Sequence, residues 1–162
     1  MKLLDENDPF LNIPVSDFDL SQMPSNFQQV ASEMIHTMIE NQAIGLAANQ
    51  VSLPWRMFTI RTIGGIYVCV NPKIIKESNV LPNPEGCLSF PGLKLIIHRP
   101  NIINVEYFDI DLNLVTETLY GIDAVCFSHE LDHLNGITFD QRVSSFQLKN
   151  ALKKRKSKTV ID

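Results

Sequence analysis

Apolar residues recur at helical spacing between residues 26 and 41. Phe27, Val30 and Met34 are separated by three or four residues, so they fall on one face of a helix. Ser25 precedes this run and belongs to the residue types that cap helix N-termini. The pattern therefore predicts an amphipathic helix that packs on the core.

Two further helical patterns follow later in the chain. The first covers residues 122–134, and Asn135 and Gly136 behind it are typical of a helix C-terminus. The second covers residues 144–156, where leucines four residues apart share one face. We expect a central and a C-terminal helix in addition to the N-terminal one.

Two pairs of β-rich segments lie between the first two helices. Residues 56–70 hold two such runs separated by Gly64 and Gly65, which is typical of a hairpin turn. A second pair consists of residues 101–108 and 112–120. Antiparallel strands are therefore expected to dominate the middle of the chain.

Three short segments are predicted from their composition. The small residues of 43–50, AIGLAANQ, would let backbone approach a ligand closely, which predicts a functional loop. The segment 81–92, rich in Pro and Gly, predicts ordered but irregular structure, and residues 137–139 predict a short strand.

Composition narrows the class of protein. The 162 residues are 44% hydrophobic and 20% charged, so we expect residues 1–162 to form a single domain. A net charge of -4 gives no general attraction to DNA or to an anionic membrane, and no apolar run approaches the roughly 20 residues that span a bilayer. The opening residues lack targeting features, and three cysteines without a secretory signal predict reduced thiols. We therefore expect a cytoplasmic protein.

The second predicted helix carries an H-E-x-x-H motif. His129 and His133 lie four residues apart, so both imidazoles face the same side and can hold one divalent ion. Glu130 follows the first histidine and could take a proton from a water molecule beside the ion. The alternative is a chance match on an ordinary helix with two partly buried histidines.

A third ligand must come from elsewhere, because no Glu or His follows the predicted helix. Asp140 is the one downstream candidate. Among the thiols, Cys69 in an apolar strand is more typical of the core, and Cys126 lies too near His129 to share its ion but suits a pocket wall. Cys87, in the Gly-containing sequence EGCLS, is the favoured ligand because a thiolate complements two neutral imidazoles.

Three blocks of sequence resemble the peptide deformylase family: AIGLAANQ, EGCLS and HELDH, in that order. With DPFL near the start, the similarity covers residues 8–140. It implies hydrolysis of the formyl group from N-formylmethionyl nascent peptides, with release of formate. It also implies an α+β fold, in which antiparallel sheets pack around a central metal-binding helix, with an N-terminal and a C-terminal helix.

The resemblance also implies a role for each residue of the site. Cys87, His129 and His133 would bind the metal, which in this family is Fe2+ and is often replaced by Zn2+, Ni2+ or Co2+. Glu130 would be the general base, and the side chain of Gln50 and the backbone N–H of Leu88 would stabilise the developing oxyanion.

Substrate contacts follow from the same resemblance. Backbone near Ile44 and Gly45 would pair with an extended peptide, and four residues would wall the methionine pocket: Ile44, Ile122, Val125 and Cys126. Simpler roles stay open, because Gln50 could cap a turn and the apolar residues could belong to the core. Glu85 could form a supporting ion pair with Arg99.

The chain departs from the family pattern at two positions. Ala43 stands where glycine is common, and its methyl group could restrict the substrate loop. Ser128 stands where glutamine usually precedes the first histidine, which removes an amide that could support the site. Metal binding should survive both changes.

Two other functions compete with deformylation. A metallopeptidase would use the same H-E-x-x-H helix, but the absence of a downstream ligand and the Cys87 block disfavour it. A non-catalytic module with a structural metal would need a fourth protein ligand and would need neither Glu130 nor Gln50.

Basic residues gather between residues 147 and 158, with no acidic residue to offset them. Clustered Lys and Arg attract phosphate, so this tail could dock on ribosomal RNA, as the C-terminal helix of some family members does. The alternative is a solvated chain end.

Overall fold

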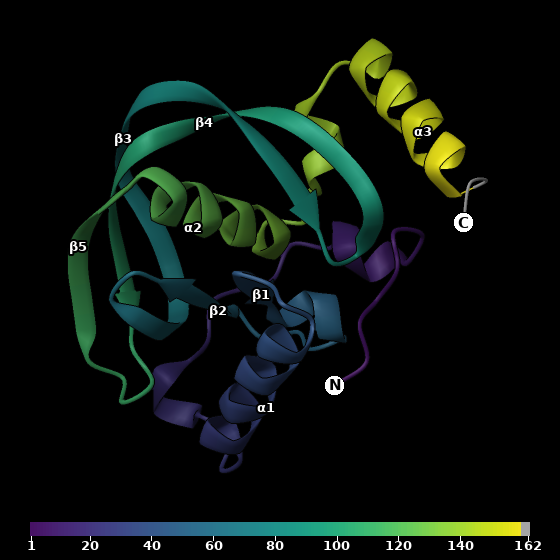
Figure 1. Ribbon diagram of the computed structural model, residues 1–162. Coiled ribbons are helices and arrows are strands. Elements are labelled where there is room, and N and C mark those ends of the chain that lie inside the picture. The colour runs from purple at the N-terminus through teal and green to yellow at the C-terminus, as the bar shows by residue number, and fades with distance from the viewer. Residues whose placement is uncertain (160–162) are drawn as a thin grey trace.

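Five strands form one antiparallel sheet in the order in which they occur along the chain (Figure 1). The computed structural model describes residues 1–159, with side chains through residue 156. The strands are β1 (Gly45–Ala47), β2 (Met57–Thr62), β3 (Gly65–Cys87), β4 (Phe90–Phe108) and β5 (Leu114–Tyr120). β3 and β4 are the longest and make a curved ribbon that frames the rest of the molecule.

Three α-helices accompany the sheet: α1 (Phe27–Glu40), α2 (Gly121–Leu134) and α3 (Ser145–Thr159). α2 lies within the curve of the strands, α1 lies beside β1 and β2, and α3 lies outside the ribbon (Figure 1). Every residue of α2 from Ala124 to Leu134 is buried. The predicted α+β fold around a central helix is confirmed. Within the described chain, no helix combines the length and apolar character needed to cross a bilayer.

The predicted hairpins are confirmed, and one capping residue is corrected. Thr62 pairs with Gly65 at the β2–β3 turn, where Gly65 has a φ of 136° that favours glycine. Phe108 pairs with Leu114 at the β4–β5 turn. The predicted cap Ser25 is wrong, because Asn26 holds the N-cap position of α1 and makes no side-chain capping bond.

Three local predictions were wrong. Residues 43–50 contain β1 and a 3-10 helix (Ala48–Val51) instead of a loop, and residues 81–92 continue β3 and β4 around a tight turn. β3 pairs with β2 only up to Val70, and its later part pairs with β4 alone. That part of β3 is therefore an edge strand, where proline is tolerated because no strand pairs with its outer side. Residues 137–139 form no strand but lead into a 3-10 helix (Phe139–Arg142).

Two aromatic contacts show how the core holds α2. Phe127 of α2 meets Phe58 of β2 edge to face, with ring centroids 4.9 Å apart. Beyond the C-terminal end of α2, Phe139 meets Phe90 of β4 at 5.3 Å. Because aromatic side chains bury large apolar areas, these contacts fix the helix relative to the sheet.

The chain reversal after α2 requires glycine at position 136. Gly136 has a φ of 71°, and a Cβ there would lie 2.8 Å from the backbone oxygen of Asn12. Gly121 has a φ of 58°, but a Cβ there would meet nothing within 4 Å. Both glycine-to-alanine changes force an unfavourable φ, whereas only Gly136→Ala adds a backbone collision.

We expect Gly136→Ala to lower the free energy of unfolding by about 1–3 kcal/mol more than Gly121→Ala does, from overpacking alone. Urea unfolding of the two variants in parallel gives this difference directly. Equal losses would show that the contact between Gly136 and residue 12 carries no specific stability.

Candidate active site

Two elements bring three potential metal ligands together. Cys87 ends β3, while His129 and His133 lie one turn apart on α2. Their ligand atoms all lie within 4.8 Å of one another, and Cys87 Sγ is 3.2 Å from His133 Nε2. The prediction of irregular structure for residues 81–92 placed Cys87 outside any strand. That prediction is wrong, because Cys87 is the last residue of β3.

The donor set fits a divalent ion with catalytic coordination. One thiol and two imidazoles suit a borderline-soft cation, and three protein ligands leave a position for water. Among the described residues the only such group is Cys87, His129 and His133, so Asp140 is not part of it. The side chains of Cys87 and His129 also line a cavity, which is where a substrate can enter.

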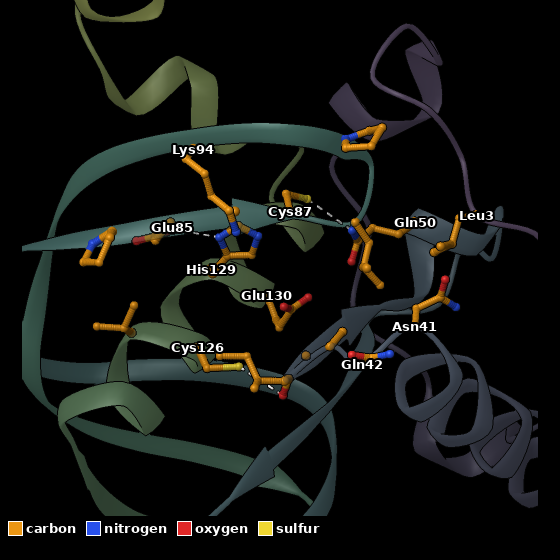
Figure 2. Close-up of a pocket in the computed structure, with 18 of the residues that line it drawn as sticks. Leu3, Asn41, Gln42, Gln50, Glu85, Cys87, Lys94, Cys126, His129 and Glu130 are labelled. Atoms are coloured by element: carbon orange, nitrogen blue, oxygen red, sulfur yellow. Dashed lines mark hydrogen bonds and ion pairs between the residues drawn. The ribbon is translucent and has the colours of Figure 1, made fainter. Parts of the chain in front are cut away.

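Glu85 fixes the orientation of His129. Its Oε2 lies 2.8 Å from His129 Nδ1, which leaves Nε2 for a metal ion (Figure 2). Arg99 donates to both oxygens of Glu85, from Nε at 2.8 Å and from a terminal nitrogen at 3.1 Å. The ion pair expected between Glu85 and Arg99 is therefore present. Burial raises the pKa of Glu85, but the hydrogen bonds from His129 and Arg99 outweigh it and lower the pKa overall.

Glu130 lies beside the ligands with one oxygen unengaged. Burial, opposed by the nearby His129, raises the pKa of its carboxyl to about 7. Its Oε2 is buried and has no hydrogen-bond partner among the described residues. A Cβ at Gly45 would lie 2.3 Å from Glu130 Oε1, so glycine at position 45 leaves the room that this carboxyl occupies.

Gln50 serves both local structure and the cavity. Its Oε1 accepts a hydrogen bond from the backbone N–H of Ala47 at 3.0 Å, inside the 3-10 helix region. This contact holds the amide so that Nε2 faces Ser89 Oγ at 3.3 Å. The same nitrogen faces Cys87 Sγ at 3.4 Å (Figure 2). The turn-capping role and a position at the site therefore coexist.

A cavity of about 570 Å3 opens beside these groups. Its lining includes every other residue named from the resemblance, apart from the deeper His133: Ile44, Gly45, Gln50, Leu88, Ile122, Val125, Cys126 and Glu130. Val125 and Cys126 are buried in the floor, whereas Ile44 and Ile122 are exposed at the rim. The Cys126 thiol donates to the carbonyl oxygen of Ile44 at 3.3 Å, and burial raises its pKa well above the usual range.

The two departures from the family pattern leave the ligands undisturbed. Ala43 does not have a positive φ, and its methyl group packs against the cluster under α1. Ser128 donates to the carbonyl oxygen of Ala124 at 2.8 Å within α2 and reaches no ligand.

Several residues of the site were not predicted. Lys94 lines the cavity from β4 and reaches over Gly86, and Leu3 lines it from the N-terminal segment. No sequence signal marks either one. β4 carries Lys94 to the cavity, and the N-terminal segment is held there by the backbone N–H of Leu4, which donates to the carbonyl oxygen of Gln50 at 2.8 Å. Asp132 was detectable inside HELDH, and it bonds to both Arg99 and Arg142.

Comparison with known proteins agrees with this geometry. Residues 1–149 match the family described as polypeptide deformylase. A peptide deformylase from Finegoldia magna is 39% identical over 143 residues, covering 85% of this chain and 86% of the relative. The crystal structure of a peptide deformylase from Synechococcus elongatus in complex with actinonin has a TM-score of 0.88 at 33% identity, covering 95% of this chain and 85% of that one.

A peptide deformylase from Legionella pneumophila has a TM-score of 0.89 at 28% identity, covering 99% of this chain and 95% of that one. Sequence match, fold and the Cys87, His129 and His133 group thus point to one conclusion. The chain belongs to the peptide deformylase family of metal-dependent hydrolases.

Proposed function

We propose that this deformylase removes the formyl group from N-formylmethionyl nascent peptides through Glu130, Gln50 and the backbone of Leu88. The observation that carries the proposal is the buried Glu130 carboxyl, with one oxygen unengaged, beside the three-ligand group and on the wall of the cavity. A structural metal site would need neither this carboxyl nor the open cavity.

Cys87, His129 and His133 would hold the ion. When bound, a divalent ion in such a site acts as a Lewis acid that makes water more acidic and polarises a carbonyl. We infer Fe2+ as the physiological ion from the family resemblance, with Zn2+, Ni2+ or Co2+ able to replace it. One thiolate and two imidazoles suit all four ions.

Glu130 takes a proton from the attacking water and later delivers it to the departing amine. Its burial supports this role, because a pKa near 7 allows the carboxyl to accept and return a proton at neutral pH. Gln50 Nε2 and the Leu88 N–H donate hydrogen bonds to the formyl oxygen as negative charge develops on it. The anchored amide of Gln50 supports this role, since a donor fixed in advance needs no reorganisation.

The substrate peptide would enter as an extended strand. Within residues 1–159, β1 pairs only with β2, and β3 beyond Val70 pairs only with β4, so each leaves a free edge along the cavity wall. Ile44 and Gly45 line the cavity and would pair with the peptide backbone there. The Ile44 carbonyl oxygen already accepts from the backbone N–H of Arg61 at 2.8 Å and from the Cys126 thiol, so it is not one of the pairing groups. The methionine side chain then fits among Ile44, Ile122, Val125 and Cys126.

Formate release from a formyl-Met tripeptide tests the reaction, using protein prepared without oxygen and with its metal quantified. N-acetyl and unblocked forms of the same tripeptide are the controls. We expect formate from the first peptide and no cleavage of the other two. Cleavage of an internal peptide bond would support the metallopeptidase alternative.

Actinonin, which is bound in the Synechococcus elongatus structure, is expected to inhibit this chain as well.

We further propose that α3 docks on the ribosome. Lys153, Lys154 and Lys156 of this helix are exposed, while Arg155 is engaged with Glu6. Lys158, the last basic residue of the predicted tail, lies outside the described side chains.

Replacing Lys153 and Lys156 with glutamate should reduce co-sedimentation with ribosomes, and salt should weaken the wild-type association. Lys73→Glu with Lys76→Glu, the same reversal of charge at two exposed positions of β3, is the matched control and should keep the wild-type association. Association with ribosomes that is unchanged by the glutamate substitutions and by added salt would contradict docking through α3.

We propose a cytoplasmic location as well. The described cysteines Cys69, Cys87 and Cys126 are all free, and a thiolate ligand persists best where the compartment is reducing.

A further inference from the structure

A chain of alternating charges runs from the protein surface to His129. Glu85 contacts His129, and Arg99 binds Glu85 on one side and Asp132 on the other, at 2.5 Å. Asp132 in turn accepts from Arg142, from Nε at 2.9 Å and from a terminal nitrogen. The order from the ligand outward is therefore carboxylate, guanidinium, carboxylate, guanidinium.

Burial makes the outermost charge necessary. The side chains of Glu85, Arg99 and Asp132 are each less than 10% exposed, whereas Arg142 is 43% exposed. Without Arg142, two buried carboxylates would share the single guanidinium of Arg99. A buried charge that loses its partner is costly, so Arg99, which already bonds to both carboxylates, would shift toward Asp132 and away from Glu85.

The position of Asp132 ties this balance to the metal site. Asp132 lies between His129 and His133 on α2. Its Oδ2 accepts hydrogen bonds from both Arg99 and Arg142, and its Oδ1 accepts from Arg142. Arg142 comes from the 3-10 helix Phe139–Arg142, which is separate from both ligand-bearing elements. Its bidentate contact therefore holds Asp132 from outside the site.

We propose that Arg142 is a positioning residue for the metal centre. By sharing the charge of Asp132, it lets Arg99 keep its hydrogen bonds to both oxygens of Glu85, and Glu85 then fixes the ring of His129 for metal binding. The inference rests on the metal site rather than on the reaction, so metal affinity measured without substrate tests it independently of the proposed function.

Cobalt binding gives the direct test. We expect Arg142→Gln to raise the apparent Kd for Co2+ by about 10–100-fold, the range found when a residue supporting a metal ligand is lost. The visible absorption of bound Co2+ should also change, because the His129 ring is held less firmly. Arg142→Lys keeps the positive charge but loses the planar guanidinium that binds both carboxylate oxygens, so its Kd should lie between those of Arg142→Gln and the wild type.

Arg155→Gln is the matched control. Arg155 also makes a bidentate contact with a carboxylate, at 2.6 and 2.9 Å from the two oxygens of Glu6, but away from the ligands. This variant should keep the wild-type Kd for Co2+. Both variants are measured well below their unfolding temperatures, so that a loss of stability alone does not alter the Kd.

A double variant separates the effect of charge balance from the simple loss of the contact between Arg142 and Asp132. Adding Asp132→Asn to Arg142→Gln removes the carboxylate that competes for Arg99, and the Kd should return toward the wild-type value. An unchanged Kd in Arg142→Gln would overturn the proposal. A double variant that binds Co2+ no better than Arg142→Gln would overturn the charge-balance argument in the same way.

Discussion

Formate release is expected to fall by about 10²–10⁴-fold in Glu130→Gln, the contribution typical of a positioned acid–base group, while the metal stays bound. The amide has nearly the same shape as the carboxyl but cannot accept a proton from water. Glu130 contributes no ligand atom to the Cys87, His129 and His133 group, so metal content should not change. Its Oε2 is buried and has no hydrogen-bond partner in the part of the chain that the structure describes, so removal of the charge should not lower the melting temperature.

The measurement is kcat/KM for a formyl-Met tripeptide, with bound metal and melting temperature determined on the same preparations. Glu77→Gln, the same chemical change at an exposed position of β3, is the matched control and should behave as wild type. If Glu130→Gln keeps its metal and still releases formate at the wild-type rate, another group must be the base.

Cys87→Ser is expected to cause the largest loss of metal binding. A serine hydroxyl does not ionise at neutral pH, so the site loses its anionic, soft ligand. Loss of a residue that only supports a ligand costs about 10–100-fold in affinity, and loss of the ligand itself should cost more. The Co2+-loaded protein should also lose the absorption that arises from sulfur-to-metal charge transfer.

Equilibrium dialysis against a competing chelator measures this affinity, and Cys69→Ser is the control. Cys69 is fully buried in β3 and is not part of the metal-binding group, so its replacement should reduce stability without weakening metal binding in the folded protein. The ligand assignment fails if Cys87→Ser retains the metal as tightly as Cys69→Ser does.

Local patterns predicted the parts of this protein whose structure depends on near neighbours in the chain. The helical spacing of apolar residues located α1 and α2, and Gly64 with Gly65 located the β2–β3 hairpin. The pair of histidines on α2 needed only the helical repeat, because residues four apart lie on the same face. Cysteine chemistry added Cys87 as the third ligand.

Prediction was wrong where a segment is stabilised by distant partners. Proline and glycine made residues 81–92 look irregular, yet pairing with β4 and a free outer edge allow a regular strand. The small residues of 43–50 looked like a loop, yet Gly45–Ala47 pairs with β2. Backbone pairing across the sheet overrides local propensity in both segments.

The chemical groups of the site can be read along the chain: two imidazoles and a carboxyl on one helix, a thiol in a separate block and an amide in a third. How these groups are held depends on the folded arrangement of the elements. The burial that raises the pKa of Glu130 and the charge chain from Arg142 to His129 both arise when α2 is enclosed by the ribbon of β3 and β4. Burial and ion pairing depend on contacts between residues far apart in the chain, and no local pattern of residues encodes them.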